Sequence, residues 1–288
     1  MTDLNPEMLV NEHCGTGENP LWDDERGLLY WCDIPGGKIF ALDLASGNHR
    51  TIHDGAGKEC GAFTLQNDGK LLLLFTGEAA LLDPDSGELT PIVRPNIVND
   101  TGRFNDCIAD PMGRIFAGTV DWDLKVRGAL FRLDFNLDST LIYSGTACAN
   151  GYGFTPNLKG LYWADTTAKT VYLFDYERET GELSNRRVWL HTPDLSPDGL
   201  TVDAAGNLWI AFYDGGFVRH YNDSAQMLVE VDIPVKNVTS CIFGGENLDQ
   251  LFITTAGGKP DDDSLAGALF RIRPEIGGPK RFRSKIVV

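Results

Sequence analysis

The sequence lacks the surplus of basic residues that binding to nucleic acid or to an anionic membrane requires. Its 288 residues include 41 Asp or Glu but only 25 Lys or Arg, which gives a formal net charge of −16 at pH 7. Phosphate-rich partners need a basic surface, so we expect neither nucleic acid nor a membrane as a partner. An acidic chain attracts cations instead, although solubility alone could explain the charge.

Long apolar runs are also missing, so we expect no membrane-spanning helix. The opening residues MTDLNPEMLV have neither the basic nor the apolar region of a secretory signal. The six cysteines form no CxxC pair and are spread along the chain, which favours buried free thiols over a disulfide framework. Together these absences predict a cytoplasmic protein.

Three further patterns are absent, and each excludes a class of structure or site. No stretch combines an apolar period of 3.6 residues with capping residues, so helix should be scarce. No GxSxG motif is present, which argues against an α/β-type serine hydrolase. The His and Cys spacing of a zinc site is missing as well.

What the chain does contain is one pattern repeated six times. Each copy has a turn with Asp or Asn near Gly, a short apolar strand, a polar break and a second apolar strand. The copies recur every 42 to 47 residues, with reference turn positions at Gly27, Gly69, Gly113, Gly160, Gly206 and Asp249. This period is typical of a β-propeller blade, whereas a β-sandwich does not repeat its turns at fixed spacing. We therefore predict an all-β, six-bladed β-propeller formed by residues 1–288 as a single domain.

Two copies show the expected hairpins most clearly, and the chain ends provide candidates for closing the ring. The predicted strands are Leu28–Cys32 with Lys38–Leu42, and Leu161–Ala164 with Thr170–Phe174. A propeller commonly completes one blade with strands from both ends of the chain. We expect Met8–Val10 and Lys285–Val288 to be the closing strands.

The repeat also predicts where chemistry should lie. The innermost strand of each blade lines the central channel, so residues at the same phase of different copies converge. Four copies carry an acidic or amide side chain eight to ten residues before the reference turn: Glu18, Asn105, Asn150 and Asp198, with Arg103 close to Asn105. Copies two and six have Cys60-Gly61 and Ser240-Cys241 there, and we expect room for substrate on their side.

Acidic and amide side chains that converge on one axis indicate a cation-binding site. Carboxylates and amide oxygens that face one another repel or stay unpaired without one. Oxygen ligands suit a divalent ion such as Ca²⁺, Mg²⁺ or Mn²⁺. Taken singly, each residue could equally be an ordinary turn former.

Five strings occur in order from about Glu18 to Ile272: GTGENPLWD, RFNDCIADPMGRIFAGT, NGYGFTPNLKGLYWADT, PDGLTVDAAGNLWIA and FGGENLDQLFITTA. Together they resemble the signatures of the gluconolactonase, senescence-marker-protein (regucalcin) and luciferin-regenerating-enzyme family of sugar lactonases. The resemblance implies one divalent metal held by Glu18, Asn150 and Asp198. Ca²⁺ is the ion expected, with Zn²⁺, Mn²⁺, Mg²⁺ and Fe²⁺ as alternatives. The family's GEGP is GENP here, which leaves the loop geometry at Asn19 open.

The resemblance also implies roles toward a substrate. Arg103 and Asn105 would contact it, together with an acidic residue after the AGT strand, where Asp121 and Asp123 are the candidates. Trp122 in the same loop is a further candidate. The implied reaction opens a sugar lactone such as gluconolactone to the aldonic acid. Asp198 is the candidate catalytic base, and the alternative is a metal-activated hydroxide that Asp198 only orients.

Two other functions stay open. A phosphotriesterase-like hydrolase is one, because a cation that polarises a carbonyl also polarises a phosphoryl oxygen. A non-enzymatic calcium-binding propeller is the other, but a scaffold would not need an Arg and an Asn in the same mouth as the metal ligands. The expected partner is a small-molecule sugar lactone, bound by a monomer or a small homo-oligomer.

Overall fold

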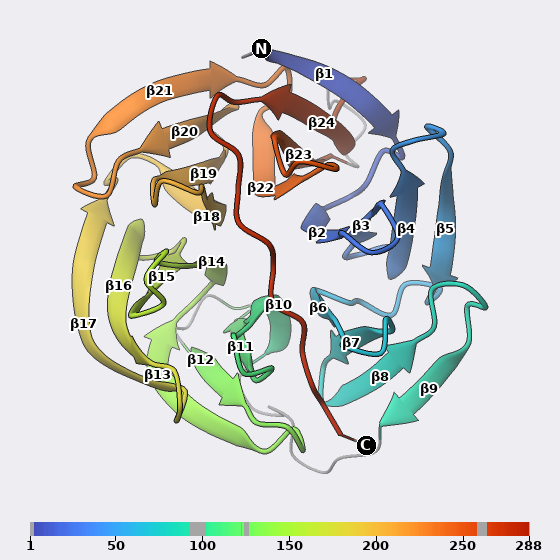
Figure 1. Ribbon diagram of the computed structural model, residues 1–288, viewed down its shortest axis with the longest axis horizontal. Helices are drawn as coiled ribbons and strands as arrows, with labels where there is room; N and C mark the ends of the chain where they lie inside the picture. The colour runs from blue at the N-terminus through green and yellow to red at the C-terminus, as the bar shows by residue number, and fades with distance from the viewer. Residues whose placement is uncertain (1–2, 93–101, 122, 124–126, 258–263, 288) are drawn as a thin grey trace.

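The strands form six four-stranded antiparallel sheets arranged as a ring (Figure 1). Residues of all six innermost strands line a cavity at its centre, which we call the central channel. The computed structural model describes residues 3–92, 102–121, 123, 127–257 and 264–287. All regular elements of these residues are strands, so the expected scarcity of helix is confirmed. Within the same ranges no helix is long and apolar enough to cross a membrane.

The first three blades follow one another along the chain, each from its innermost to its outermost strand. Blade 1 contains β2 (Gly17–Asp23), β3 (Leu28–Asp33), β4 (Lys38–Asp43) and β5 (His49–Asp54). Blade 2 contains β6 (Ala62–Leu65), β7 (Leu71–Phe75), β8 (Glu78–Leu82) and β9 (Leu89–Ile92). Blade 3 contains β10 (Arg103–Ala109), β11 (Ile115–Val120), β12 (Gly128–Leu133) and β13 (Ser139–Thr146).

The remaining three blades complete the ring. Blade 4 contains β14 (Ala149–Phe154), β15 (Gly160–Asp165), β16 (Thr170–Glu177) and β17 (Glu182–His191). Blade 5 contains β18 (Ser196–Val202), β19 (Leu208–Tyr213), β20 (Phe217–Tyr221) and β21 (Met227–Asp232). Blade 6 contains β22 (Asn237–Gly244), β23 (Gln250–Ala256) and β24 (Ala268–Arg273), and β1 (Asp3–Asn11) is its outermost strand. The six predicted copies are thus six blades.

The turn between the first and second strands of each blade contains a residue with positive φ, and that of blade 6 contains a second one, Gly245 (φ 88°). Glycine takes this role in four blades, as Gly27, Gly69, Gly113 and Gly206. In blades 4 and 6 the left-handed residues are Leu158 (φ 54°) and Leu248 (φ 56°), each one or two positions before the predicted turn position. Glycine adopts this conformation at little cost, which is why it recurs in the repeat.

The hydrophobic core lies between neighbouring blades. Six clusters of buried apolar side chains each join residues of two adjacent blades. The largest members include Trp31, Trp163 and Trp209, whose side chains are almost completely buried. Each would cost about 3–5 kcal/mol to truncate to alanine. The ring is therefore held together by side-by-side packing of the blades.

The N-terminal strand closes the ring as predicted. In β1, Met8 pairs with Phe270 and Val10 with Leu269 of β24, in antiparallel register. The first strand in sequence thereby completes the last blade. This pairing joins the two ends of the repeat array, as Figure 1 shows at the edge of the ring.

The prediction for the C-terminus was wrong, because Lys285–Val287 form no blade strand and Val288 lies outside the described residues. Residues 274–287, which we call the C-terminal strap, instead cross one face of the ring over the channel (Figure 1). The strap ends at blades 2 and 3, where Ser284 bridges Gln66 and Lys285 N–H donates to Gly113 O over 2.9 Å. It runs across the blades because its hydrogen-bond partners lie on several of them.

Deletion of residues 284–288 tests this role of the strap. The deletion removes the buried Ser284, whose Oγ lies 2.7 Å from Thr64 Oγ1, and the buried Ile286, whose N–H donates to Gln66 Oε1. We expect the free energy of unfolding in urea to fall by about 3–5 kcal/mol. The control is Val287→Ala, which changes an exposed side chain. Equal stability of the deleted and intact chains would contradict the strap's role.

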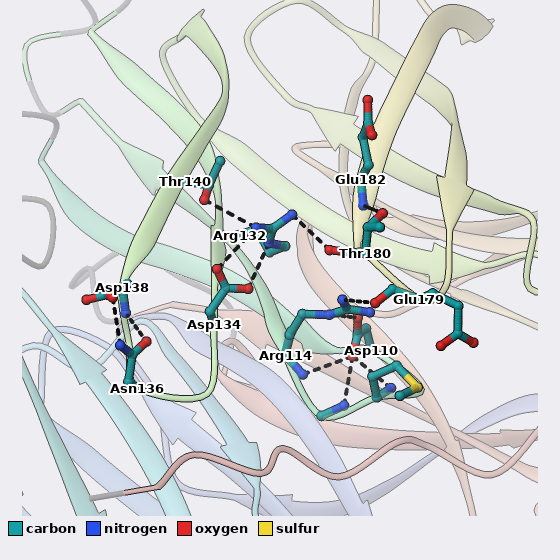
Figure 2. A network of polar contacts seen from close by, with 12 residues as sticks. Asp110, Arg114, Arg132, Asp134, Asn136, Asp138, Thr140, Glu179, Thr180 and Glu182 are labelled. Atoms are coloured by element: carbon teal, nitrogen blue, oxygen red, sulfur yellow. Dashed lines mark hydrogen bonds and ion pairs between the residues drawn. The ribbon is translucent and has the colours of Figure 1, made fainter.

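A buried ion pair joins blades 3 and 4 on the same face as the strap (Figure 2). Arg114 Nε donates to Asp110 Oδ2 over 2.7 Å, and its Nη1 donates to Glu179 O over 3.0 Å. Tyr176 of blade 4 also donates to Asp110 Oδ2, over 2.9 Å. Figure 2 shows a second arginine beside this pair, Arg132, which pairs with Asp134 nearer the surface.

Arg114 and Arg132 allow the stability contribution of a buried ion pair to be compared with that of a more exposed one. The Arg114 and Asp110 side chains are 5% and 0% exposed, whereas those of Arg132 and Asp134 are 19% and 32% exposed. Arg114→Met leaves a buried carboxylate without its cation, so we expect a loss of about 3–5 kcal/mol in unfolding free energy. Arg132→Met should cost about 1 kcal/mol or less. Similar losses of unfolding free energy for both variants in urea would refute the claim that the buried Arg114–Asp110 ion pair contributes more to stability than the more exposed Arg132–Asp134 pair.

Candidate functional site

The candidate site residues lie where the innermost strands are irregular. The register between first and second strands shifts at Glu18/Leu21, Phe104/Asp106, Asn150/Tyr152 and Pro197/Leu200. Such β-bulges re-aim side chains and are common beside functional sites. The bulges therefore occur at the phase at which the sequence places its acidic and amide side chains.

Neighbouring innermost strands approach one another closely at these bulges. A Cβ atom at Gly151 would lie 2.5 Å from Asp198 O and 2.6 Å from Leu200 N. Only glycine fits between the strands of blades 4 and 5 there, which explains the glycine after Asn150. This approach brings Asn150 and Asp198 to the same side of the channel.

Glu18 is buried, and Asn19 fixes the loop around it. Asn19 N–H donates to Glu18 Oε2 over 2.9 Å. Asn19 itself has φ 49°, and its side chain pairs with both main-chain groups of Phe63 in blade 2, at 3.2 and 3.3 Å. Asparagine tolerates the left-handed conformation better than most residues. The change from GEGP to GENP therefore keeps the backbone geometry and adds a link between blades 1 and 2.

Two substitutions at Asn19 separate these effects. Asn19→Gly keeps the left-handed backbone but removes the link, so we expect a loss of about 1 kcal/mol in unfolding free energy. Asn19→Ala removes the link and also strains the backbone, for a loss of about 2–3 kcal/mol. Urea unfolding of both variants is the measurement. An alanine variant as stable as the glycine variant would show that the left-handed backbone at position 19 causes no strain, which would contradict this explanation.

The carboxyl groups of Glu18 and Asp198 are buried near each other. Burial, followed by the Asp106 carboxylate, raises the pKa of Glu18 to about 8. Burial, followed by the charges of Glu18 and Asp106, raises the pKa of Asp198 well above its usual range. Asp198 Oδ1 has no hydrogen-bond partner among the described residues, although it is fully buried. This pair of acids is thus poorly compensated within the protein.

Asp106 is buried and lines a cavity on the axis of the ring. Burial raises its pKa to about 7, while Cys107 N–H and the Arg281 guanidinium act in the opposite direction. Arg281 comes from the C-terminal strap, and its Nη2 donates to Thr201 Oγ1 over 3.2 Å. A cavity of about 40 Å³ that both Asp106 and Arg281 line lies on the channel side of the strap. The strap thus supplies a positive charge to the acidic channel from the opposite face.

Arg103, Asn105 and Asn150 are joined by hydrogen bonds. Arg103 Nη1 donates to Asn105 Oδ1 over 2.8 Å, and Asn105 Nδ2 donates to Asn150 Oδ1 over 2.7 Å. Asn105 Nδ2 also donates to Ala149 O over 2.9 Å. Both amide hydrogens of Asn105 are therefore used within the protein, and any contact with a substrate would fall to its Oδ1.

The two acidic candidates of the following loop differ in their surroundings. Asp121 is buried and accepts hydrogen bonds from Arg127 Nε over 3.3 Å and from Arg127 Nη2 over 3.2 Å. The Arg127 side chain lowers the pKa of Asp121 to about 2. Asp123 is exposed and lies 3.7 Å from Arg127 Nη2. Asp121 thus binds Arg127, while Asp123 is exposed; Trp122 lies outside the described residues.

One residue at the site was missed from the sequence. Glu59 of blade 2 lies 3.4 Å from Arg103 Nε through its Oε2. It precedes Gly69 by the same interval that separates Arg103 from Gly113, so the repeat could have revealed it. Copy two therefore carries an acid at this phase in addition to Cys60-Gly61, and the expectation that it carries none was wrong.

The thiols are free, as predicted, and several of them line the channel. All six cysteines are unpaired with one another. Cys148 lies beside the site, with its sulfur 3.6 Å from Asn150 Nδ2. Burial, then Asp198, raises the pKa of the Cys148 thiol to about 12. A protonated thiol is a poor metal ligand, so the oxygen groups dominate the chemistry of the site.

The described residues contain no group of three or more His, Cys, Asp or Glu side chains placed to hold a metal ion. The set implied by the sequence has only two such side chains, Glu18 and Asp198, with Asn150 as the third. His191 is exposed and contacts Thr170 over 3.0 Å, away from these residues.

Comparison with known proteins places this arrangement in context. The profile of the "SMP-30/Gluconolactonase/LRE-like region" matches residues 16–257. Pentonolactonase XacC from Haloferax volcanii is 38% identical over 96% of this chain and 97% of its own. Human regucalcin is 31% identical over 94% and 95%. The structure of a luciferin-regenerating enzyme aligns with a TM-score of 0.87 at 28% identity, covering 98% of this chain and 99% of that one.

Proposed function

The chain belongs to the SMP-30/gluconolactonase/LRE-like family, and from this premise we propose that it is a metal-dependent hydrolase of sugar lactones. The observation that carries the proposal is the pair of buried acids, Glu18 and Asp198, in which Asp198 Oδ1 has no hydrogen-bond partner among the residues that the structure describes. An amide and an arginine lie beside that pair, as a hydroxylated, uncharged substrate requires. The name of the Haloferax volcanii relative makes five-carbon sugar lactones the first substrates to test.

The residues present fit a divalent cation. Glu18 and Asp198 are buried and repel each other, so a cation between them would remove an unfavourable interaction. Asn150 Oδ1 accepts one hydrogen bond, from Asn105, and an amide oxygen has a second lone pair. We propose that Glu18, Asn150 and Asp198 hold the ion. Oxygen donors of this kind favour Ca²⁺, and they also accept Mg²⁺ or Mn²⁺.

Asp198 is the proposed catalytic base. A bound divalent cation would polarise the lactone carbonyl and stabilise the charge that develops on its oxygen. Asp198 takes a proton from water as the water oxygen bonds to the carbonyl carbon. The bond from that carbon to the ring oxygen then breaks, and Asp198 returns the proton to the leaving oxygen. The products are a carboxylic acid and a free hydroxyl group.

Arg103 and Asn105 orient the substrate in this proposal. Arg103 is fixed from two sides, by Asn105 Oδ1 at 2.8 Å and by Glu59 at 3.4 Å, so its charge is held at the mouth. Asn105 Oδ1 can accept from a sugar hydroxyl in addition to Arg103. Of the two acids, exposed Asp123 is the proposed substrate contact, while Asp121 accepts hydrogen bonds from Arg127. Fixed donors and acceptors of this kind reduce the entropy cost of positioning.

The test is a set of lactone hydrolysis assays with and without metal. Proton release is measured with pentono-1,4-lactones, glucono-1,5-lactone and an aryl phosphotriester. The full-length protein is first treated with chelator and then supplied with Ca²⁺, Mg²⁺, Mn²⁺, Zn²⁺ or Fe²⁺. We expect kcat/KM to fall at least about 100-fold on chelation and to return with metal. Asp198→Ala should lower kcat/KM by about 1,000-fold or more, because it removes both a ligand and the base.

The control variant is His191→Ala, an exposed histidine of the same part of the chain, which should keep full activity. Lactone hydrolysis that ignores chelation, or that persists in Asp198→Ala, would refute the metal mechanism. Faster hydrolysis of the phosphotriester would favour the alternative hydrolase. Metal binding without turnover of any ester would favour a non-enzymatic propeller.

A further inference from the structure

A chain of polar contacts runs around the mouth through four blades. It begins in blade 2, where Glu59 pairs with Arg103 Nε at 3.4 Å. In blade 3, Arg103 Nη1 donates to Asn105 Oδ1 over 2.8 Å. Asn105 Nδ2 then donates to Asn150 Oδ1 of blade 4 over 2.7 Å. Each contact joins side chains that the repeat places at the same depth in the ring.

The chain continues through Thr166, the last residue of the string NGYGFTPNLKGLYWADT, for which the sequence alone indicates no role. Asn150 Nδ2 donates to Thr166 Oγ1 over 2.8 Å. The Thr166 hydroxyl in turn donates to Pro197 O of blade 5 over 2.7 Å. Pro197 directly precedes Asp198, so the chain ends at the residue next to the candidate base. Thr166 lies in the loop between β15 and β16, at the same mouth.

The two ends of this chain fix its direction. A guanidinium group can only donate hydrogen bonds, and a main-chain carbonyl can only accept them. The single proton of Thr166 is used on Pro197 O, so Thr166 Oγ1 must accept from Asn150. The NH₂ of Asn150 therefore faces Thr166, and its oxygen faces Asn105.

This direction matters because the two ends of an amide have nearly the same shape but opposite chemistry. Turned by 180°, Asn150 would set its NH₂ against the NH₂ of Asn105, which already donates to Ala149 O. It would also offer hydrogens, not a lone pair, to a cation. The hydrogen-bond chain thus selects the one orientation in which Asn150 can act as an oxygen ligand.

We propose that Thr166 is a positioning residue, whose hydroxyl holds the Asn150 amide with its oxygen available to the cation. This inference rests on the proposed cation site of Glu18, Asn150 and Asp198. Thr166 does not touch the cation or the substrate in this role; it acts through Asn150.

The Thr166 backbone is held independently of its hydroxyl. Thr166 N–H donates to Cys148 O over 3.1 Å, and Thr166 O accepts from Lys169 N–H over 3.1 Å. The side chain is partly buried. Thr166→Val keeps the shape of the side chain and these main-chain bonds, and it removes only the hydroxyl. Thr166→Ser keeps the hydroxyl and removes only a methyl group.

The experiment measures metal affinity directly. Full-length, chelator-stripped protein is titrated with Mn²⁺ by isothermal calorimetry. We expect Thr166→Val to weaken the Kd for Mn²⁺ at least tenfold, and Thr166→Ser to stay within about twofold of wild type. The matched control is Thr192→Val, which removes a threonine hydroxyl of the same blade that bonds to Lys169 O and Leu195 O. It should bind Mn²⁺ like wild type.

The outcomes separate this inference from the cation site on which it rests. Wild-type affinity in Thr166→Val would overturn the inference and leave the cation site in place. Equal weakening by Thr166→Ser and Thr166→Val would also overturn it, because a hydroxyl would then not be the group that matters. No Mn²⁺ binding by the wild-type protein would overturn both. Melting temperatures of the metal-free variants confirm that Thr166→Val is folded like Thr192→Val.

Discussion

Six innermost strands run close around one axis, and the polar groups that they bring there must be paired with one another, with the strap or with a ligand. The strands approach so closely that Gly151 has no room for a side chain. Amides and arginine satisfy one another along the mouth, and Arg281 of the strap faces Asp106 from the opposite side. Glu18 accepts one hydrogen bond, from Asn19 N–H, and Asp198 Oδ1 has no partner among the described residues. Burial of unpaired charge is costly. Without a cation these acids avoid that cost by holding their protons, as their raised pKa values indicate, and the proposed cation would stabilise both in the charged form.

The repeat makes a ring of similar blades, but the site depends on how the blades differ. The same bulge carries Glu18 in blade 1, Asn105 in blade 3, Asn150 in blade 4 and Asp198 in blade 5. A symmetric ring of six identical acids would repel strongly. Different side chains on equivalent bulges instead give two acids, linked amides and one arginine, a mixture that suits a cation and a hydroxylated substrate together.

Much of this arrangement could be predicted from the sequence, because the sequence repeat determines both the number of blades and which residues face the axis. The spacing of turns predicted six blades, and the phase of Asn105 and Asn150 predicted that they lie together. The path of the strap could not be predicted, since its partners Gln66 and Gly113 are distant in sequence and it carries no repeat. The roles of Asn19 and Thr166 depend on contacts between blades, which no local pattern encodes. Glu59 was predictable from its interval to Gly69, but the neighbouring Cys-Gly obscured it.

The central claim is that one divalent cation binds between Glu18, Asn150 and Asp198. The most direct measurement is anomalous diffraction at long wavelength from crystals grown with Ca²⁺. We expect one anomalous peak at the mouth of the channel, with an oxygen of each of these residues at about 2.3–2.6 Å. A channel mouth without a peak, or a Ca²⁺ ion held by other residues, would contradict it.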